Sequence, residues 1–317
     1  MSRKSDYYVV KIFHRKGENA MENNIKERIT FQEGMEMFMK SLDSRDCSNY
    51  TLKNYHHILE TFYIHMAKEV FNGEVYVQDI TSHHIEEHLL YRKNVLNNSP
   101  VTRLNALIAI QSMYKYLLRH HYVNHNPADD VDRIKLPKRE RVYLTAEEIH
   151  LVLNAIKNPH IYAAAATLAY TGLRISELVS LKISDVDLEK QEIFVRCGKN
   201  KKDRVVPFSD DLKRILNGYV KNHRSNKTDY FFATPRTGRI CPSYFNEKLH
   251  EAADEVGLQK NISAHILRHS AASLMVLNQA PISSVQKMLG HSDIKTTSLY
   301  LHVLNDDLHQ AAELLKY

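Results

Sequence analysis

The hydrophobic positions of this chain recur mostly at intervals of three and four, which is the period of amphipathic helices. In the first part of the chain the pattern predicts four helices, whose starts lie at Thr30, at Ser48 or Thr51, at Thr81 and at Ser99. Ser and Thr at these places can accept hydrogen bonds from the free N–H groups of a first helical turn. Four such helices with short links predict a bundle over residues 29–125, preceded by a loose arm of residues 1–28.

A polar stretch without an apolar period follows the bundle. Residues 126–142 contain two prolines and many charges, and we expect an extended linker there. Roughly a dozen extended residues reach about 40 Å, enough to pass around one side of a DNA duplex. A plain connector between domains would have the same composition.

We expect residues 143–317 to form a second domain. A capping box at Thr145–Glu148 opens a helix, and an Ala-rich run at 161–170 predicts another. Gly172 then permits a turn into a second apolar run, 173–181, which we expect to be helical. Two short strands, 192–197 and 204–208, flank a basic hairpin loop, and helical patterns resume from Asp211 to the end. The fold class predicted is mainly α with a small β-sheet.

Composition narrows the class of protein. The 317 residues are 43% hydrophobic and 25% charged, with a net charge of +6, which is typical of a soluble protein and suits a polyanionic partner. Three distant cysteines without a CxxC pair predict reduced thiols in a cytoplasmic protein. No apolar run approaches the ~18 residues of a membrane span. Met21 is an alternative start to Met1, because the patterned sequence begins only near Ile29.

The turn after Gly172 places Arg174 at the start of the next predicted helix. Glu177 lies three residues on, on the same helical face, where it can hold the guanidinium group. The planar fork of an arginine fixed in this way matches two oxygens of a phosphate. An ordinary surface ion pair is the alternative.

Further candidates lie downstream, each with an ordinary structural alternative. Ser263 is expected to cap a helix that carries His265 and Arg268 on one face. The other candidates are Lys199 in the hairpin loop, His291 after a helix that Gly290 ends, and Tyr300. His265 and His269 have the i, i+4 spacing of a zinc pair. We expect no metal there, because no glutamate follows His265 as in HExxH and no third ligand is apparent.

Together these residues predict a phosphate site that uses no metal. Arg174 and Arg268 could stabilise the negative charge that an attacked phosphodiester gains. A tyrosine nucleophile, with a pKa of about 10 when unperturbed, needs cationic neighbours and a proton acceptor. A leaving 5′ oxygen needs a proton, which a loop lysine could supply. That these residues meet in space is an inference from their chemistry.

The order and spacing of the motifs resemble the tyrosine recombinases, or phage integrase family, and closely resemble its Xer-like members. The matching segments are TGLRISEL ending at Leu178, GKNKKDRVVP at 198–207, HILRH at 265–269, LGHS at 289–292, and Tyr300 nine residues after His291. The resemblance covers roughly residues 30–310. The stretch from Ser48 to Tyr55 and the Asn126-Pro127 step are similar to the family's DNA-gripping, SAM-like core-binding domain and its exit.

The resemblance implies a role for each residue. Tyr300 attacks the scissile phosphate and forms a 3′-phosphotyrosine, while Lys199 is the general acid to the 5′ oxygen. Arg174 and Arg268 bind the phosphate, and Glu177 supports Arg174. His265 is the acid/base for the nucleophile, and His291 hydrogen-bonds the phosphate. The family uses no ATP, and we expect neither a cofactor nor a metal.

The resemblance also implies strand exchange by four protomers on two DNA sites, each a short inverted repeat, through a Holliday junction. Residues 306–317 carry an apolar stripe and are expected to form a tail helix that docks in a neighbouring protomer or packs on its own domain. The short arm favours a simple recombinase that integrates, excises or resolves a mobile element or replicon. The alternatives are a type IB topoisomerase, a telomere resolvase and a non-catalytic DNA-binding relative.

Overall fold

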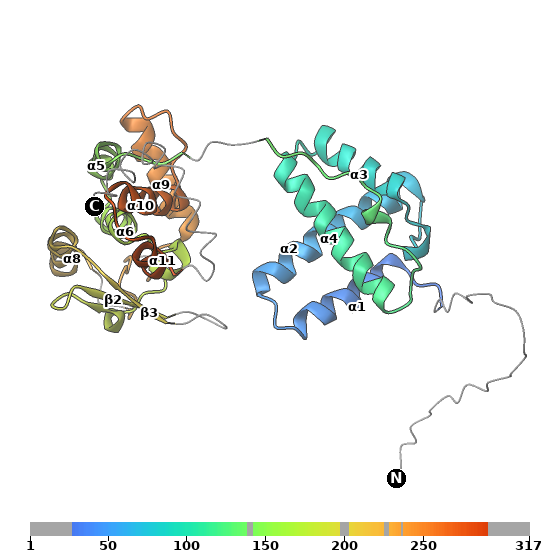
Figure 1. The fold of residues 1–317 in the computed structure, drawn as a ribbon, viewed down its shortest axis with the longest axis horizontal. Coiled ribbons are helices and arrows are strands. Elements are labelled where there is room, and N and C mark those ends of the chain that lie inside the picture. Colours follow the sequence, from blue (N-terminus) through green and yellow to red (C-terminus); the bar gives the residue numbers. More distant parts are fainter. Residues whose placement is uncertain (1–26, 138–141, 197–202, 225–227, 236, 291–317) are drawn as a thin grey trace, which may run out of the picture. The chain divides into compact units, whose positions relative to one another are not determined.

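The computed structural model describes residues 27–137, 142–196, 203–224, 228–235 and 237–290. The chain divides into two compact units that separate between residues 139 and 140. Each unit has a hydrophobic core of its own, and each is described here by itself (Figure 1).

The first unit is the predicted four-helix bundle. Its helices are α1 (Phe31–Asp43), α2 (Asn49–His65), α3 (Ser82–Asn94) and α4 (Pro100–Arg119). The predicted starts are confirmed, with Ser48 rather than Thr51 as the cap of α2. The side chains of Thr30, Ser48, Thr81 and Ser99 each accept from a backbone N–H of the first turn. Helix α4 packs against the other three, and its Met113 and Tyr114 are fully buried among them. A π-helical turn (Met66–Val70) and a 3-10 turn (Val77–Asp79) connect α2 to α3.

The residues directly after the bundle, 126–130, differ from the extended linker that the sequence predicts, whereas residues 132–137 form no helix or strand. Pro127–Asp129 form a 3-10 turn, and the Asn126 side chain accepts from the Ala128 N–H at 3.1 Å. Ala128 is buried in the core of the first unit, and Val131 and Ile134 pack partly against it. Sparse apolar residues inside a charged run are sufficient to dock this segment, although they show no period.

The second unit is built around α6 (Pro159–Thr171), which is buried on nearly all sides. The other helices are α5 (Ala146–Ala155), α7 (Ile175–Leu178), α8 (Asp210–Asn222), α9 (Pro242–Glu255), α10 (Ala264–Leu277) and α11 (Ile282–Leu289). The chain reaches the sheet through a 3-10 turn (Ile183–Asp185). Helix α6 packs against α5, α8 and α10 (Figure 1). Its four consecutive alanines, 163–166, allow this close approach because their side chains are small.

An antiparallel sheet of three strands lies in the second unit, in the order β1 (Val186–Asp187), β2 (Glu192–Val195) and β3 (Arg204–Pro207). Strands β2 and β3 are the predicted pair, in a register that places Val195 opposite Arg204. Strand β1 was not predicted, because two residues are too few to show a period. The sequence and the structure agree on a mainly helical chain with one small sheet.

Two other expectations for the second unit were wrong. The apolar run 173–181 forms only the single turn α7, and the described residues 228–235 and 237–240 are not helical. The backbone explains both, because Leu181 O accepts from Phe231 N at 2.8 Å and Ile183 N donates to Asp229 O at 2.9 Å. These bonds between distant segments replace the helical bonds that the local pattern predicts.

Candidate active site

The turn between α6 and α7 presents Arg174 as the sequence predicts. Gly172 ends α6 in the left-handed conformation, with φ 65°, and Arg174 occupies the position before the first residue of α7. The backbone N–H of Arg174 donates to Glu177 Oε2 and its Nη1 donates to Glu177 Oε1, both at 2.9 Å. The predicted pairing of these two side chains is therefore present, and it reaches the backbone as well as the guanidinium group.

Glu177 also binds a second arginine. Arg204, the first residue of β3, donates from Nη1 and Nη2 to the two carboxylate oxygens of Glu177, at 3.1 and 2.8 Å. Burial alone would raise the pKa of Glu177. The hydrogen bonds from Arg204 and from the Arg174 backbone outweigh it, and together with the charge of Arg204 they lower the pKa to about 2. The carboxylate is thus ionised throughout the neutral range.

Helix α10 supplies the second predicted phosphate ligand. Ser263 caps the helix, which confirms the predicted start, and His265 lies exposed in its first turn. Arg268, one turn later, is buried, and it donates from Nη1 to Gly172 O at 2.5 Å and from Nη2 to Leu289 O at 2.8 Å. These bonds attach α10 to the end of α6 and to the end of α11.

The carboxyl end of α11 is the point where these elements meet. Its last carbonyls, like those of any helix, have no partner within the helix. Three successive carbonyls accept from three different arginines: Met288 O from Arg204 at 3.1 Å, Leu289 O from Arg268 at 2.8 Å and Gly290 O from Arg174 at 3.2 Å. Cations are also electrostatically favourable at this end of a helix. The two predicted phosphate-binding arginines are therefore neighbours in space, although they are far apart in the sequence.

Gly290 is required at this point for two reasons. Its φ of 66° is left-handed, and a Cβ there would lie 2.7 to 2.9 Å from three atoms of the Arg204 guanidinium group. The chain passes from Gly290 directly to His291. The remaining predicted site residues, Lys199, His291 and Tyr300, lie outside the described residues, as does the expected tail helix, 306–317.

Arg204 is the residue that the sequence interpretation missed. It lies inside the GKNKKDRVVP segment, at the start of a predicted strand, and the sequence pattern gives it no role. The available signal was a single arginine on a short strand otherwise occupied by apolar residues. Its partners are distant in the sequence, and no local pattern reveals them.

Two of the three cysteines lie within the described residues. Cys47 and Cys241 are free thiols. No group of three or more His, Cys, Asp or Glu side chains gathers as metal ligands would in the part of the chain that the structure describes. Of the helices in that part, none is both long enough and apolar enough to span a bilayer.

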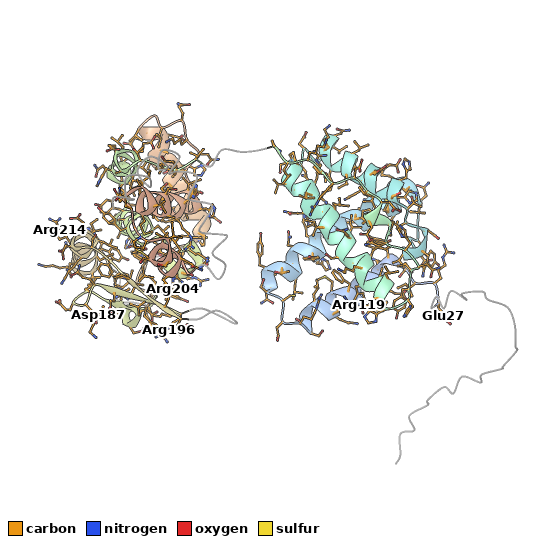
Figure 2. All side chains as sticks on the ribbon, in the orientation of Figure 1. Glu27, Arg119, Asp187, Arg196, Arg204 and Arg214 are labelled. Carbon is orange, nitrogen blue, oxygen red and sulfur yellow. The ribbon has the colours of Figure 1, made fainter. Side chains whose placement is uncertain are left out.

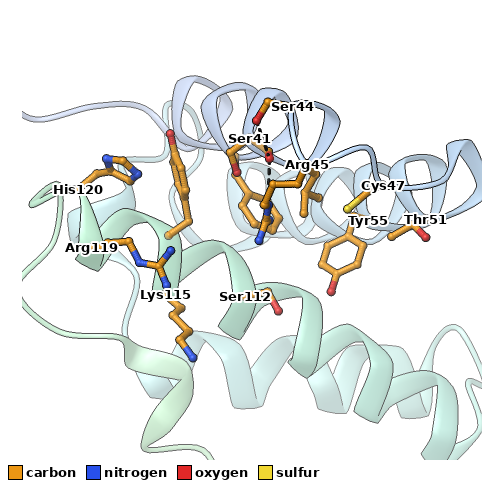
Figure 3. A pocket seen from close by; sticks show the side chains of 13 residues that line it. Ser41, Ser44, Arg45, Cys47, Thr51, Tyr55, Ser112, Lys115, Arg119 and His120 are labelled. Atoms are coloured by element: carbon orange, nitrogen blue, oxygen red, sulfur yellow. Dashed lines mark hydrogen bonds between the residues drawn. The ribbon is translucent and has the colours of Figure 1, made fainter. Parts of the chain in front are cut away.

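A basic cavity of about 520 Å³ lies in the first unit, between α1, α2 and α4 (Figure 3). Three cationic side chains line it: Arg45, after the end of α1, and Lys115 and Arg119 on α4. Hydroxyl groups line it as well, among them that of Thr51 in the first turn of α2. No acidic residue is among the described side chains that line this cavity. Cations and hydroxyl groups together are typical contacts of a nucleic-acid backbone.

Comparison with known proteins agrees with these features. A sequence profile of the phage integrase family matches residues 142–306, and one of the phage integrase N-terminal SAM-like domain matches residues 35–123. A tyrosine recombinase of Pseudothermotoga lettingae is 30% identical over 250 residues, which is 78% of this chain and 86% of that protein. Tyrosine recombinase XerD of Halalkalibacterium halodurans is 30% identical over 297 residues, which is 90% of this chain and 94% of that protein.

Among solved structures, a lambda integrase tetramer bound to a Holliday junction has the same fold. The TM-score is 0.70 at 18% sequence identity, and the match covers 86% of this chain and 79% of that chain. Both units therefore have recognised counterparts, and the family expected from the motifs is confirmed. The chain belongs to the phage integrase family and is a tyrosine site-specific recombinase.

Proposed function

We propose that this protein cleaves and rejoins DNA at specific sites through a 3′-phosphotyrosine on Tyr300. One observation carries the proposal: Arg174 and Arg268 donate to the adjacent carbonyls of Gly290 and Leu289. Two guanidinium groups held this close can bind the two non-bridging oxygens of one phosphate and stabilise its transition state. A site built from arginines on opposite sides of the molecule could not do this.

In the proposed step the energy of the phosphodiester bond is kept in the phosphotyrosine bond. The Tyr300 oxygen attacks the phosphorus, and its proton passes to His265. The bond from phosphorus to the 5′ oxygen breaks, and Lys199 donates a proton to that oxygen, which leaves as a 5′-hydroxyl. Rejoining is the reverse attack by a 5′-hydroxyl on the phosphotyrosine, so neither ATP nor a metal takes part. Two facts support these roles: His265 is exposed one turn before Arg268, and His291 directly follows Gly290.

The proposed substrate is double-stranded DNA with a short inverted repeat. The basic cavity of the first unit supports this, because Lys115 and Arg119 can bind backbone phosphates while hydroxyl groups such as Thr51 donate to the same oxygens (Figure 3). We further propose a tetramer on two sites, with a Holliday junction intermediate and the tail docked in a neighbouring protomer. The matched fold of a lambda integrase tetramer on such a junction supports that arrangement. The biological role proposed is integration, excision or resolution of a mobile element or replicon.

A covalent trap tests the chemistry. The protein is incubated with a pool of nicked duplexes of random sequence, from which the short strand released by cleavage diffuses away. The wild-type chain should form a DNA adduct that survives denaturation, and its DNA should share an inverted repeat. Tyr300→Phe should bind the recovered duplex normally and form no adduct. An adduct in Tyr300→Phe would mean that another residue is the nucleophile.

The same preparations separate the rival activities. A type IB topoisomerase would relax any supercoiled plasmid, whereas this protein should relax only plasmids that carry the recovered site. A zinc hydrolase that used His265 and His269 would lose activity to a chelator, and we expect the adduct yield to be unchanged by EDTA.

The basic cavity is tested by non-specific binding to a duplex of fixed length. Each phosphate contact adds about one unit to the slope of log affinity against log salt. Replacement of both Lys115 and Arg119 by Ala should lower that slope by about two. Lys93→Ala, which removes an exposed cation of α3 outside the cavity, is the control and should leave the slope unchanged. If Lys93→Ala lowered the salt slope as much as the double replacement does, the cavity would not be a preferred DNA contact.

A further inference from the structure

Arg204 connects two parts of the candidate active site that the sequence separates. From the start of β3 its side chain extends towards α11 (Figure 2) and is only 10% exposed. Its Nη1 and Nη2 bind both oxygens of Glu177, and its Nε binds Met288 O. The guanidinium plane also lies against the Cα of Gly290, where no side chain would fit. All these partners are protein groups, so Arg204 is placed to hold the site together.

We propose that Arg204 is a positioning residue for strand cleavage; this inference rests on the function proposed above. Through Glu177 it fixes the orientation of Arg174. Through Met288 and Gly290 it fixes the end of α11, from which the chain continues to His291 and Tyr300. One side chain thereby sets both the phosphate-binding arginine and the point of departure of the segment that carries the nucleophile.

Arg204 also keeps the net charge of the site positive. A carboxylate paired with Arg174 alone would offset the positive charge that the phosphate requires. Because Glu177 is bound by Arg204 at both oxygens as well, the three side chains together carry one net positive charge. Arg174 therefore stays oriented by a carboxylate while the cluster still attracts an anion.

A lysine cannot replace this arginine. An ammonium group is a point charge on a flexible stem, whereas the observed contacts need a planar group that donates in three directions. The lysine variant therefore separates geometry from charge. If charge alone mattered, Arg204→Lys would behave as the wild type does.

The test compares Arg204→Met and Arg204→Lys with a matched arginine variant, Arg214→Met. Arg214 lies on α8, is ion-paired with Asp211, and touches neither Glu177 nor α11 in the described structure. Single-turnover adduct formation is measured on the duplex recovered by the wild-type chain, at increasing protein concentration. Far-UV circular dichroism checks that each variant is folded.

We expect the limiting rate of adduct formation to fall about 100-fold in Arg204→Met, the typical effect of a displacement near 1 Å at a reacting centre. Arg204→Lys should remain at least tenfold below the wild type, and Arg214→Met should equal it. The half-saturating protein concentration and the salt slope of binding should not change, because the Arg204 side chain is only 10% exposed and its described hydrogen bonds are to Glu177 and Met288 O. Loss of fold stability alone would not produce this separation of rate from binding.

A double-mutant cycle tests the route through Glu177. If Arg204 acts through this carboxylate, Arg204→Met combined with Glu177→Gln should be little slower than the worse single variant. Fully multiplicative effects would overturn the route through Glu177. A salt slope lowered by one, or a wild-type rate in both Arg204 variants, would overturn the inference as a whole. Absence of an adduct in the wild-type chain would instead refute the proposed function.

Discussion

Two glycines with nearly the same φ give a direct measure of the contact between Arg204 and α11. Gly290 has φ 66° and Gly257 has φ 67°, so an alanine meets a left-handed φ at both positions. A Cβ at Gly257 would have no atom within 4 Å, whereas one at Gly290 would lie 2.7 Å from Nη1 of Arg204. The difference between the two substitutions therefore isolates the displacement of the guanidinium group.

The expected magnitudes follow from these contacts. A left-handed alanine costs about 1–2 kcal/mol, which is the whole effect expected for Gly257→Ala. At Gly290 the guanidinium group must also move, and it is held by hydrogen bonds to Glu177 and to Met288 O. Hydrogen bonds that involve charged groups contribute about 1.5–3 kcal/mol each, so losing one brings Gly290→Ala to about 3–5 kcal/mol.

Hydrogen exchange is the suitable assay, because the two units have separate hydrophobic cores that need not unfold together and the chain contains no tryptophan. Opening free energies are compared for peptides from α6 and α10, both of which pack in the core of the second unit. Gly290→Ala should also slow adduct formation, and Gly257→Ala should not. Equal losses of stability in the two variants would refute the close approach, and with it the contact between Arg204 and α11.

Two further predictions concern pH. Burial is the main cause that lowers the pKa of His88 from 6.5 to about 3, and the charges of Arg92 and His65 add to it. Between these two pH values His88 is protonated in the unfolded chain and neutral in the folded chain. The stability of the first unit should fall as pH drops below 6.5, by about 2 kcal/mol at pH 5, and exchange of α3 amides should lose this slope in His88→Phe. Glu177 has a pKa of about 2 in the folded chain and 4.5 in the unfolded chain, so the stability of the second unit should fall by about 3 kcal/mol as pH falls from 4.5 to 2. Hydrogen exchange of α10 amides should show this pH dependence, and Glu177→Gln should remove it.

The accuracy of the sequence interpretation depended on how far apart the interacting residues lie. Helix starts such as those at Thr30 and Ser99 were predictable, because the cap and its partner are three residues apart. The pairing of Arg174 with Glu177 was predictable for the same reason. The single turn α7 was not, because the helical bonds expected beyond it are replaced by bonds from the segment around Phe231. Arg204 was missed for the same reason, because its partners Glu177 and Met288 are distant from it in the sequence.

The way the arginines are held explains how the site can stay positive. Had each of the three been fixed by a carboxylate of its own, the cluster would carry no net charge and would have little attraction for a phosphate. Among the described contacts one carboxylate, Glu177, serves both Arg174 and Arg204, while backbone carbonyls accept from further donors of all three arginines. The end of a helix contributes only about half a negative charge. Three guanidinium groups are thus positioned while about one and a half positive charges remain. Burial of Arg268 and partial burial of the other two strengthen the electric field of this charge. Backbone carbonyls therefore achieve what more acidic side chains could not, because they fix the cations without neutralising them.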